Sequence, residues 1–233
     1  EGIIPSVEAA FNKLDQPMPL GYSSSGTIIE VGEGMGDFKT GDRVACAGGG
    51  YAVHAEYELV PYNLLARLPE AVDFESAAFT TLGAIAMHGF RLANPQVGDS
   101  VCVIGLGLLG LLAAQIARAA GCQVFGIDIA ENRIQLADQL GITASFTSTA
   151  LEFTPGLTRG LGFDHVLICA DTRSDETVHL AGQIARDRGN VIAIGAVGLD
   201  LPRKVYYEKE LPFKVSRSYG PGRYDAIYEE KGI

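Results

Sequence analysis

The chain has 233 residues, of which 47% are hydrophobic and 20% charged, values typical of a globular protein with one large or two modest domains. Its formal net charge of −10 argues against nucleic acid or an anionic membrane as a partner. The longest uncharged apolar run, residues 101–114, is shorter than the about 20 residues that span a bilayer. The four cysteines form no C-x-x-C motif, so we expect buried thiols, a reducing cytoplasmic location and no structural zinc.

The first third of the sequence predicts a β unit of short strands separated by glycine-rich turns. We expect a short helix over residues 5–14 and a strand over 22–31, then a turn over 38–44 that leads into a strand through residue 47, and a further strand over 52–60. Asp73 is suited to cap the N-terminus of a long helix over residues 74–92.

From residue 100 onward, predicted strands alternate with predicted helices, which indicates a parallel sheet of the doubly wound dinucleotide-binding type. The helices include residues 132–140 and 174–188. The six predicted strands cover residues 101–104, 123–127, 144–147, 165–170, 191–195 and 213–219.

The stretch SVCVIGLGLLGLLAAQIARAAG, residues 100–121, is the most informative part of the chain. A buried strand leads into a G-x-G-x-x-G turn and a helix over residues 108–120. Gly105 allows the sharp turn, Gly107 lets a pyrophosphate approach the backbone, and Gly110 lets the helix pack closely on the strand. Unpaired amides at the helix N-terminus, at Leu108 and Leu109, attract a phosphate.

An acidic residue follows the glycine turn at the spacing that dinucleotide sites use. Asp128 ends the next strand, 23 residues after Gly105 by sequence number, and a carboxylate there can accept the adenosine ribose hydroxyls. The alternative is a solvated acid at the start of a loop. A carboxylate disfavours a 2′-phosphate, so we predict NAD(H) over NADP(H). Arg133 could reach a 2′-phosphate, but we expect it on the solvent face of the next helix, and we place Ala170 and Gly195 at the nicotinamide side.

The chain resembles the medium-chain dehydrogenase/reductase family, which includes the zinc alcohol dehydrogenases. Five stretches carry the resemblance: PLGYSSSGTIIEVGEG, FKTGDRVA, AEYELVPYNLLARLPE, ESAAFTTLGAIAMHG and VGDSVCVIGLGLLGLLAAQIARAAGCQVFGID. It implies a partial GroES-like β domain over residues 1–73 and a Rossmann nucleotide domain over residues 74–233. It also implies that the chain is a piece of a longer protein, without the first GroES-like strands and the terminal segment that returns to them.

Departures from the family pattern lie at the metal positions. Zinc-dependent members carry Gly-His-Glu where this chain has Gly21-Tyr22-Ser23, and a further ligand would fall at Thr81. We therefore predict no catalytic zinc, and we interpret His54, in a strand, and His88, on an apolar helix, as packed or hydrogen-bonded side chains rather than ligands. Tyr22 is our first candidate for a proton donor, with Ser24 and Thr81 as weaker ones; Tyr22 could instead be an aromatic that packs under the cofactor.

These features predict an oxidoreductase that moves a hydride between NAD(H) and a small secondary alcohol or carbonyl substrate, which could be related to a sugar. The tail KELPFKVSRSYGPGRYDAIYEEKG resembles a subgroup of bi-domain bacterial oxidoreductases fused to a second oxidoreductase domain, and also resembles bacteriochlorophyllide hydroxyethyl dehydrogenases. The edge strand over residues 213–219 favours a homodimer. The rival hypothesis is a non-catalytic NAD(H)-binding module that senses redox state or acts as a scaffold.

Overall fold

The computed structural model describes residues 19–231, so the helix predicted over residues 5–14 lies outside the described residues. The described chain forms two compact units. One runs up to Thr81 and includes the segment from Ala226, and the other is Leu82–Asp225.

The first unit contains a three-stranded antiparallel sheet in the order β1-β2-β3. The strands are β1 (Ser23–Thr27), β2 (Arg43–Ala47) and β3 (Leu65–Arg67), the last preceded by the short 3-10 helix η1 (Tyr62–Leu64). Alternation along β2 places Val44 and Cys46 in a small core with Ala52. This antiparallel sheet confirms the β unit that was predicted in the first third of the sequence.

The prediction of a strand over residues 52–60 is wrong. The segment forms turns and bends, because its backbone bonds locally, as from Ala55 N to Val53 O at 3.0 Å. Ala52 reaches the small core, but Tyr57 and Leu59 in the middle of the segment are 75% and 91% exposed. The first strand is shorter than predicted as well, since β1 ends at Thr27.

The long helix predicted over residues 74–92 is divided into α2 (Phe74–Ala77) and α3 (Thr80–Ala93). Asp73 caps α2 as predicted, and its side chain accepts a hydrogen bond from Ser76 N at 2.7 Å. The division follows from Thr80, whose hydroxyl donates to the Ala77 carbonyl oxygen at 2.7 Å and so competes with regular helix bonding.

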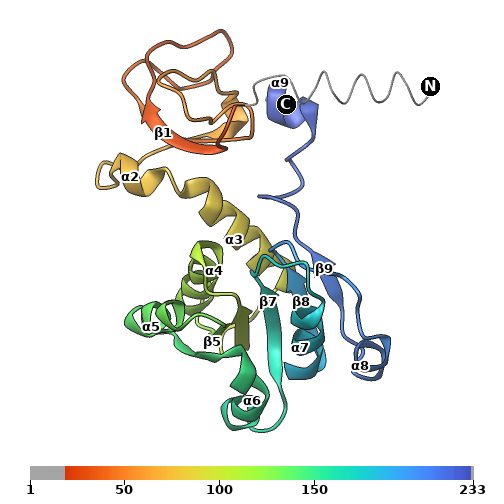
Figure 1. Ribbon diagram of the computed structural model, residues 1–233. Coiled ribbons are helices and arrows are strands. Elements are labelled where there is room, and N and C mark those ends of the chain that lie inside the picture. The colour runs from red at the N-terminus through yellow and green to blue at the C-terminus, as the bar shows by residue number, and fades with distance from the viewer. Residues whose placement is uncertain (1–18, 232–233) are drawn as a thin grey trace, which may run out of the picture. The chain divides into compact units, whose positions relative to one another are not determined.

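The second unit is a six-stranded parallel sheet in the order β6-β5-β4-β7-β8-β9, which confirms the doubly wound fold (Figure 1). Consecutive elements alternate between strand and helix, apart from the short 3-10 helix η2 (Thr147–Thr149). The strands are β4 (Ser100–Ile104), β5 (Gln123–Asp128), β6 (Thr143–Phe146), β7 (Phe163–Ile168), β8 (Ala185–Ala193) and β9 (Phe213–Val215). The helices after α3 are α4 (Leu108–Ala119), α5 (Glu131–Gln139), α6 (Ala150–Thr158), α7 (Glu176–Ile184), α8 (Arg203–Glu208) and α9 (Ala226–Lys231).

Alternating side chains of the strands bury two separate cores, one on each face of the parallel sheet. Val101 and Val103 of β4 pack with residues of α3, α4 and α5. Cys102 and Ile104 of the same strand pack with residues of α6, α7 and α8. Both faces are therefore covered, and the ends of the strands remain as the places where a ligand can bind.

Several predicted boundaries in this unit are wrong. The strand predicted over residues 165–170 ends at Ile168, and the one predicted over residues 191–195 begins at Ala185 and ends at Ala193. The helix predicted over residues 174–188 ends at Ile184, because Ala185 is already extended and begins β8. The last strand ends at Val215 rather than at residue 219, because Ser218 has a positive φ of 52° and turns the chain. It does lie at the sheet edge, as predicted.

The C-terminal segment from Ala226 belongs to the first compact unit. Helix α9 contacts η1, and Asn63 Nδ2 donates to the Tyr228 carbonyl oxygen at 2.8 Å. Among the described helices, none combines the length and the hydrophobicity that crossing a membrane requires.

Candidate functional site

The glycine turn at the carboxyl end of β4 has the conformation that its sequence predicts. Gly105 has a φ of +93°, and a Cβ there would lie 2.6 Å from the Ala170 amide nitrogen. A Cβ on Gly110 would overlap the Gly105 carbonyl oxygen. A Cβ on Gly107, by contrast, would meet no atom within 4 Å. The turn is therefore closed behind Gly105 and Gly110 and open at Gly107, the position that faces a ligand.

Helix α4 begins directly at this opening. Gly107 is its N-cap and provides no side-chain hydrogen bond to the first turn. The amides of Leu108 and Leu109, in the first turn of a twelve-residue helix, therefore remain available to an anion, and Leu108 is half exposed. The geometry fits the pyrophosphate of a dinucleotide, whose charge the helix N-terminus stabilises.

The carboxylate of Asp128 ties two loops together at this edge of the sheet. Its Oδ2 accepts a hydrogen bond from Leu106 N at 2.6 Å, and its Oδ1 accepts one from Ala130 N at 2.9 Å. The side chain is only 2% exposed. Asp128 thus holds the glycine turn in place, a positioning role that the sequence did not reveal, in addition to the predicted contact with ribose.

Arg133 lies on the exposed side of α5, as predicted, but its guanidinium reaches back to the end of β5. Its Nη1 is 3.5 Å from Asp128 Oδ2, and its side chain is half exposed. The pair places one cation beside one buried anion at the predicted adenosine end of the site. A cation in this position reduces the electrostatic repulsion between the Asp128 carboxylate and a 2′-phosphate.

Ala170 and Gly195 come together with Gly105 at the carboxyl ends of three neighbouring strands. A Cβ on Gly195 would overlap the Ala170 carbonyl oxygen, and Gly195 N donates to Ile168 O at 2.9 Å. The loops after β4, β7 and β8 therefore pack backbone against backbone. This close packing is possible only without a side chain at Gly195.

One apolar residue at this edge of the sheet was not predicted. Ile129 directly follows Asp128 and is 82% exposed, although it continues a buried strand. An exposed isoleucine beside the acid offers a flat apolar surface for the adenine of a dinucleotide. The signal in the sequence was an apolar residue immediately after the acid at a strand end.

The predicted catalytic side chains of the first unit are not gathered in one place. Ser24 donates from its hydroxyl to Glu58 Oε2 at 2.6 Å and lines a groove of about 500 Å³. The neighbouring Ser23 donates to the Ala78 carbonyl oxygen and accepts from Thr81 N. Successive residues of a strand point to opposite faces, so Ser24 and Thr81 lie on opposite sides of β1.

Thr81 is buried, with 2% exposure, and its hydroxyl donates to the Cys46 carbonyl oxygen at 3.3 Å. It links the start of α3 to β2. Tyr22, by contrast, is 46% exposed, and its hydroxyl has no hydrogen-bond partner among residues 19–231. Of the three candidates, Tyr22 alone has a hydroxyl free of the described residues.

The residues at the family's metal positions do not fit zinc. Tyr22, Ser23 and Thr81 offer hydroxyls, and those of Ser23 and Thr81 are already hydrogen-bonded. Burial raises the pKa of the nearby Cys46 thiol to about 11, which disfavours the thiolate that zinc binds. Within the described part of the chain, no three His, Cys, Asp or Glu side chains are placed to hold a metal ion together.

Of the two histidines that could serve as spare ligands, His88 is partly buried, whereas His54 is exposed and the prediction that it is packed is wrong. His54 lies in a bend rather than in the predicted strand, and a Cβ on Gly21 would lie 2.6 Å from its ring. His88 lies on α3, and burial lowers the pKa of its imidazole.

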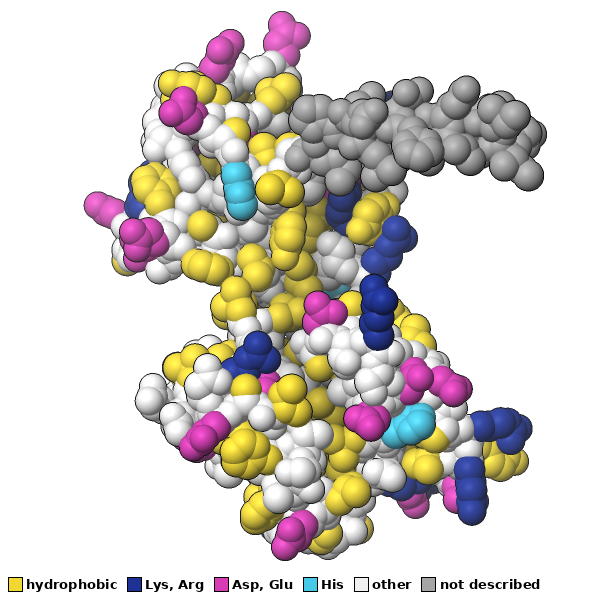
Figure 2. Space-filling model, in the orientation of Figure 1, with side chains coloured by type: hydrophobic (Ala, Val, Ile, Leu, Met, Phe, Trp, Pro, Cys, Tyr) yellow, Lys and Arg dark blue, Asp and Glu magenta, His cyan; other side chains and the backbone are white. Residues whose placement is uncertain are grey.

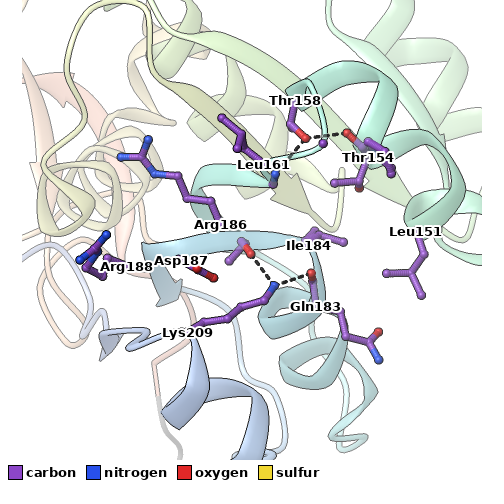
Figure 3. A pocket seen from close by; sticks show the side chains of 14 residues that line it. Leu151, Thr154, Thr158, Leu161, Gln183, Ile184, Arg186, Asp187, Arg188 and Lys209 are labelled. Atoms are coloured by element: carbon purple, nitrogen blue, oxygen red, sulfur yellow. Dashed lines mark hydrogen bonds between the residues drawn. The ribbon is translucent and has the colours of Figure 1, made fainter.

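A larger hollow, of about 690 Å³, lies at the opposite, amino edge of the parallel sheet (Figure 3). Its polar groups serve the fold. Lys209 Nζ donates to the carbonyl oxygens of Gly182, Gln183 and Ala185 at the end of α7. Thr158 donates to the Thr154 carbonyl oxygen at 2.8 Å and accepts from Gly162 N. The Lys209 and Thr158 side chains in this hollow are therefore already hydrogen-bonded, unlike the backbone amides at the open turn after Gly107.

Comparison with protein families identifies both parts of the chain. A family described as zinc-binding dehydrogenase matches residues 109–230, and one described as alcohol dehydrogenase GroES-like domain matches residues 4–70. Among curated proteins, the chain is 29% identical to a probable D-xylulose reductase A of Arthroderma otae, over 94% of this chain and 71% of that protein. It is 28% identical to sorbitol dehydrogenase 1 of Saccharomyces cerevisiae, over 78% of this chain and 61% of that protein.

Solved structures of similar fold include two informative relatives. Galactitol-1-phosphate dehydrogenase from Escherichia coli has a TM-score of 0.76 and 27% identity, over 89% of this chain and 70% of that one. A zinc-binding dehydrogenase from Sinorhizobium meliloti 1021 bound to NADP has a TM-score of 0.73 and 25% identity, over 86% of this chain and 68% of that one. The chain thus spans roughly two thirds of the length of these relatives.

Proposed function

Because this chain belongs to the zinc-type medium-chain alcohol dehydrogenase family, we propose that its full-length protein transfers a hydride between NAD(H) and a secondary alcohol or carbonyl substrate. The observation that carries the proposal is the glycine turn, open at Gly107 and backed by the N-terminus of α4. A bound nicotinamide cofactor supplies the hydride acceptor or donor, and the protein supplies binding, orientation and proton transfer.

Each part of the site has a role in holding the dinucleotide. The amides of Leu108 and Leu109 bind the pyrophosphate, and Ile129 contacts the adenine. Ala170 and Gly195 form the close-packed backbone surface against which the nicotinamide lies. Asp128 fixes the turn by accepting two backbone hydrogen bonds. Its carboxylate oxygens have further lone pairs, and these accept hydrogen bonds from the ribose hydroxyls.

The proposed preference is for NAD(H) over NADP(H). The Asp128 carboxylate lies where a 2′-phosphate would approach, and the two anions repel. Arg133, 3.5 Å from that carboxylate, offsets part of this repulsion. We therefore expect a preference of about tenfold, equal to about 1.4 kcal/mol, rather than complete exclusion of NADP(H).

A polyol or sugar alcohol is the proposed substrate class. The support comes from relatives named as a D-xylulose reductase, a sorbitol dehydrogenase and a galactitol-1-phosphate dehydrogenase. The tail resemblance to bi-domain bacterial oxidoreductases supports a second fused oxidoreductase domain. The edge position of β9, where Val215 is 59% exposed, supports pairing of two copies across this strand.

Proton transfer is assigned to Tyr22 and occurs without zinc. Hydride transfer leaves the substrate oxygen with a proton to gain or lose, and a side chain within about 3 Å must handle it. Tyr22 is exposed, whereas Thr81 is buried and its hydroxyl is engaged with Cys46. The competing function is a redox sensor, which would bind NADH and turn over no substrate.

The deciding experiment measures NADH and NADPH binding, zinc content and sorbitol oxidation on the full-length protein. We expect tighter NADH binding, no stoichiometric zinc and measurable turnover. Tyr22→Phe should lower turnover by about 10²-fold or more without changing NADH affinity, whereas Tyr57→Phe, at an exposed tyrosine of the same unit, should change neither. Stoichiometric zinc would refute the metal-free mechanism, and unchanged turnover in Tyr22→Phe would refute the assignment of the donor.

A further inference from the structure

Helix α6 carries its large hydrophobic residues on the outside of the molecule. Leu151, Phe153 and Leu157 are each about half exposed. The buried side of the helix holds Thr154 and Thr158 instead, and their hydroxyls donate to the carbonyl oxygens four residues earlier at 2.7 and 2.8 Å. Because a helix of a globular protein normally buries its apolar side chains, this exposed face has the character of a surface that contacts another protein.

The exposed face of α6 has two apolar ridges with a gap between them. Leu151 and Pro155 are four residues apart and form one ridge, and Phe153 and Leu157 form the other in the same way. Gly156 lies between the ridges, and a Cβ there would meet no atom within 4 Å. A second helix can therefore come close to the backbone at Gly156 and pack its side chains between the ridges.

Two charges of opposite sign stand at the two ends of this face. Glu152 lies in the first turn of α6 and Arg159 directly follows its last turn, so about two helical turns separate them. Both residues are exposed, and neither side chain has an ion pair or hydrogen bond with residues 19–231. A helix with one acidic and one basic end is complementary in charge to a second copy of itself, provided that the second copy runs antiparallel.

The position of α6 in the second unit leaves this face accessible. Among the described elements, α7 and η2 pack most closely on α6, and Figure 1 places the helix at the lower end of the unit. Figure 2, in the same orientation, shows hydrophobic and acidic side chains side by side at that end. The edge strand β9 belongs to another part of the sheet, so this surface is separate from the pairing proposed across β9.

We propose that α6 packs against α6 of a second copy of this chain in an antiparallel contact with two-fold symmetry. In such a contact Glu152 meets the partner's Arg159, and by symmetry Arg159 meets the partner's Glu152. The midpoint between the two charged residues falls between Pro155 and Gly156, so both ion pairs form when the open glycine positions lie at the crossing. The apolar ridges on either side exclude water from this crossing. The contact does not involve the cofactor site and goes beyond the proposed function.

The test is sedimentation equilibrium of the full-length protein over about 1–200 μM, because a nine-residue helix offers less than the about 800 Å² per partner of a standard interface and should associate weakly. Arg159→Glu places acids opposite acids and should weaken this association at least about tenfold. Glu152→Arg should do the same by placing arginines opposite arginines. The double variant Glu152→Arg/Arg159→Glu restores both ion pairs with exchanged signs and should associate as the wild type, a rescue that a merely structural role of either residue would not produce.

Asp138→Arg and Lys204→Glu make the same charge changes at exposed positions of α5 and α8, and these matched controls should associate as the wild type. Equal molecular mass of the wild type and Arg159→Glu at every concentration, no rescue in the double variant, or the same loss in the controls would overturn the inference. If Arg159→Glu does not fold, the comparison of Glu152→Arg with the double variant decides it. A protein that fails to bind NADH would refute the proposed function and would leave this test unchanged.

Discussion

At the carboxyl edge of the parallel sheet, the backbone is open at Gly107 and few side chains are involved. At the amino edge of the same sheet, ionisable side chains are dense and paired. His165 Nε2 lies 3.0 Å from Asp99 Oδ2, and Arg186 Nη1 lies 2.6 Å from Asp164 Oδ1. The amino edge also has a hollow of about 690 Å³, yet its polar groups serve the fold. A dense set of charged side chains therefore does not by itself mark a ligand site, and our proposal depends instead on the unsatisfied backbone amides at the carboxyl edge.

The largest effect is expected from a methyl group added to the glycine turn. Gly110→Ala places a Cβ on the Gly105 carbonyl oxygen, so the free energy of unfolding should fall by more than about 3 kcal/mol. Gly107→Ala meets no atom and has a φ of −69°, so its stability should change by less than about 1 kcal/mol. Its NADH affinity should nevertheless fall at least tenfold. Chemical denaturation and NADH titration of both variants separate the two effects, and equal stability would contradict the proposed packing.

Asp128→Ala tests whether the carboxyl edge depends on one buried acid. The change leaves Leu106 N and Ala130 N without their acceptor, which should cost about 1–3 kcal/mol of stability. NADH affinity should fall as well, because the glycine turn loses its support. Asp138→Ala, an acid of α5 that lies away from the turn, is the control for added or lost charge. A variant as stable as the wild type would show that Asp128 contacts only the cofactor.

Asp164→Ala tests whether an acid at the amino edge contributes to stability without affecting cofactor binding. Asp164 Oδ2 accepts from Ser100 N at 2.8 Å and from the Ser100 hydroxyl at 2.6 Å, and its Oδ1 pairs with Arg186. Its removal should cost about 1–2 kcal/mol in denaturation experiments. NADH affinity should be unchanged in the folded protein. If the variant is as fully folded as the wild type but binds NADH more weakly, the amino edge also affects cofactor binding at the carboxyl edge.

The smallest effect is a pH dependence at Asp99. Burial raises the pKa of this carboxyl, but hydrogen bonds from Gln96 N and His165 outweigh it and leave the pKa below its usual value. A lowered folded pKa means that the carboxylate stabilises the fold above the unfolded pKa of about 3.9. Asp99→Asn should therefore lose less than about 1 kcal/mol near neutral pH. The difference from wild type should shrink as the pH falls below about 4; a difference that does not depend on pH would exclude the ion pair as its cause.

The glycine turn and the doubly wound sheet could be predicted because their signals are local. Gly105, Gly107 and Gly110 encode backbone geometry directly, and alternating strands and helices encode a parallel sheet. The catalytic candidates could not be predicted in this way. Whether a hydroxyl is free depends on a distant partner, as when Thr81 donates to Cys46 and Ser24 to Glu58.

The boundaries that were wrong have the same origin. Residues 52–60 have strand-like alternation, but no described strand pairs with them, so they form bends. The helix predicted through residue 92 is interrupted where the Thr80 hydroxyl bonds the Ala77 carbonyl oxygen. In both cases a hydrogen-bond partner, rather than the intrinsic preference of the residues, decides the local structure.

The sequence by itself determined the family and the fold class, and it predicted the place of dinucleotide binding, because glycine spacing and hydrophobic period act over a few residues. The tertiary structure decided which side chains remain available there. It placed Asp128 in the support of the turn and brought Arg133 back to it. These outcomes depend on long-range hydrogen bonds and burial, which satisfy some polar groups and leave others for a ligand.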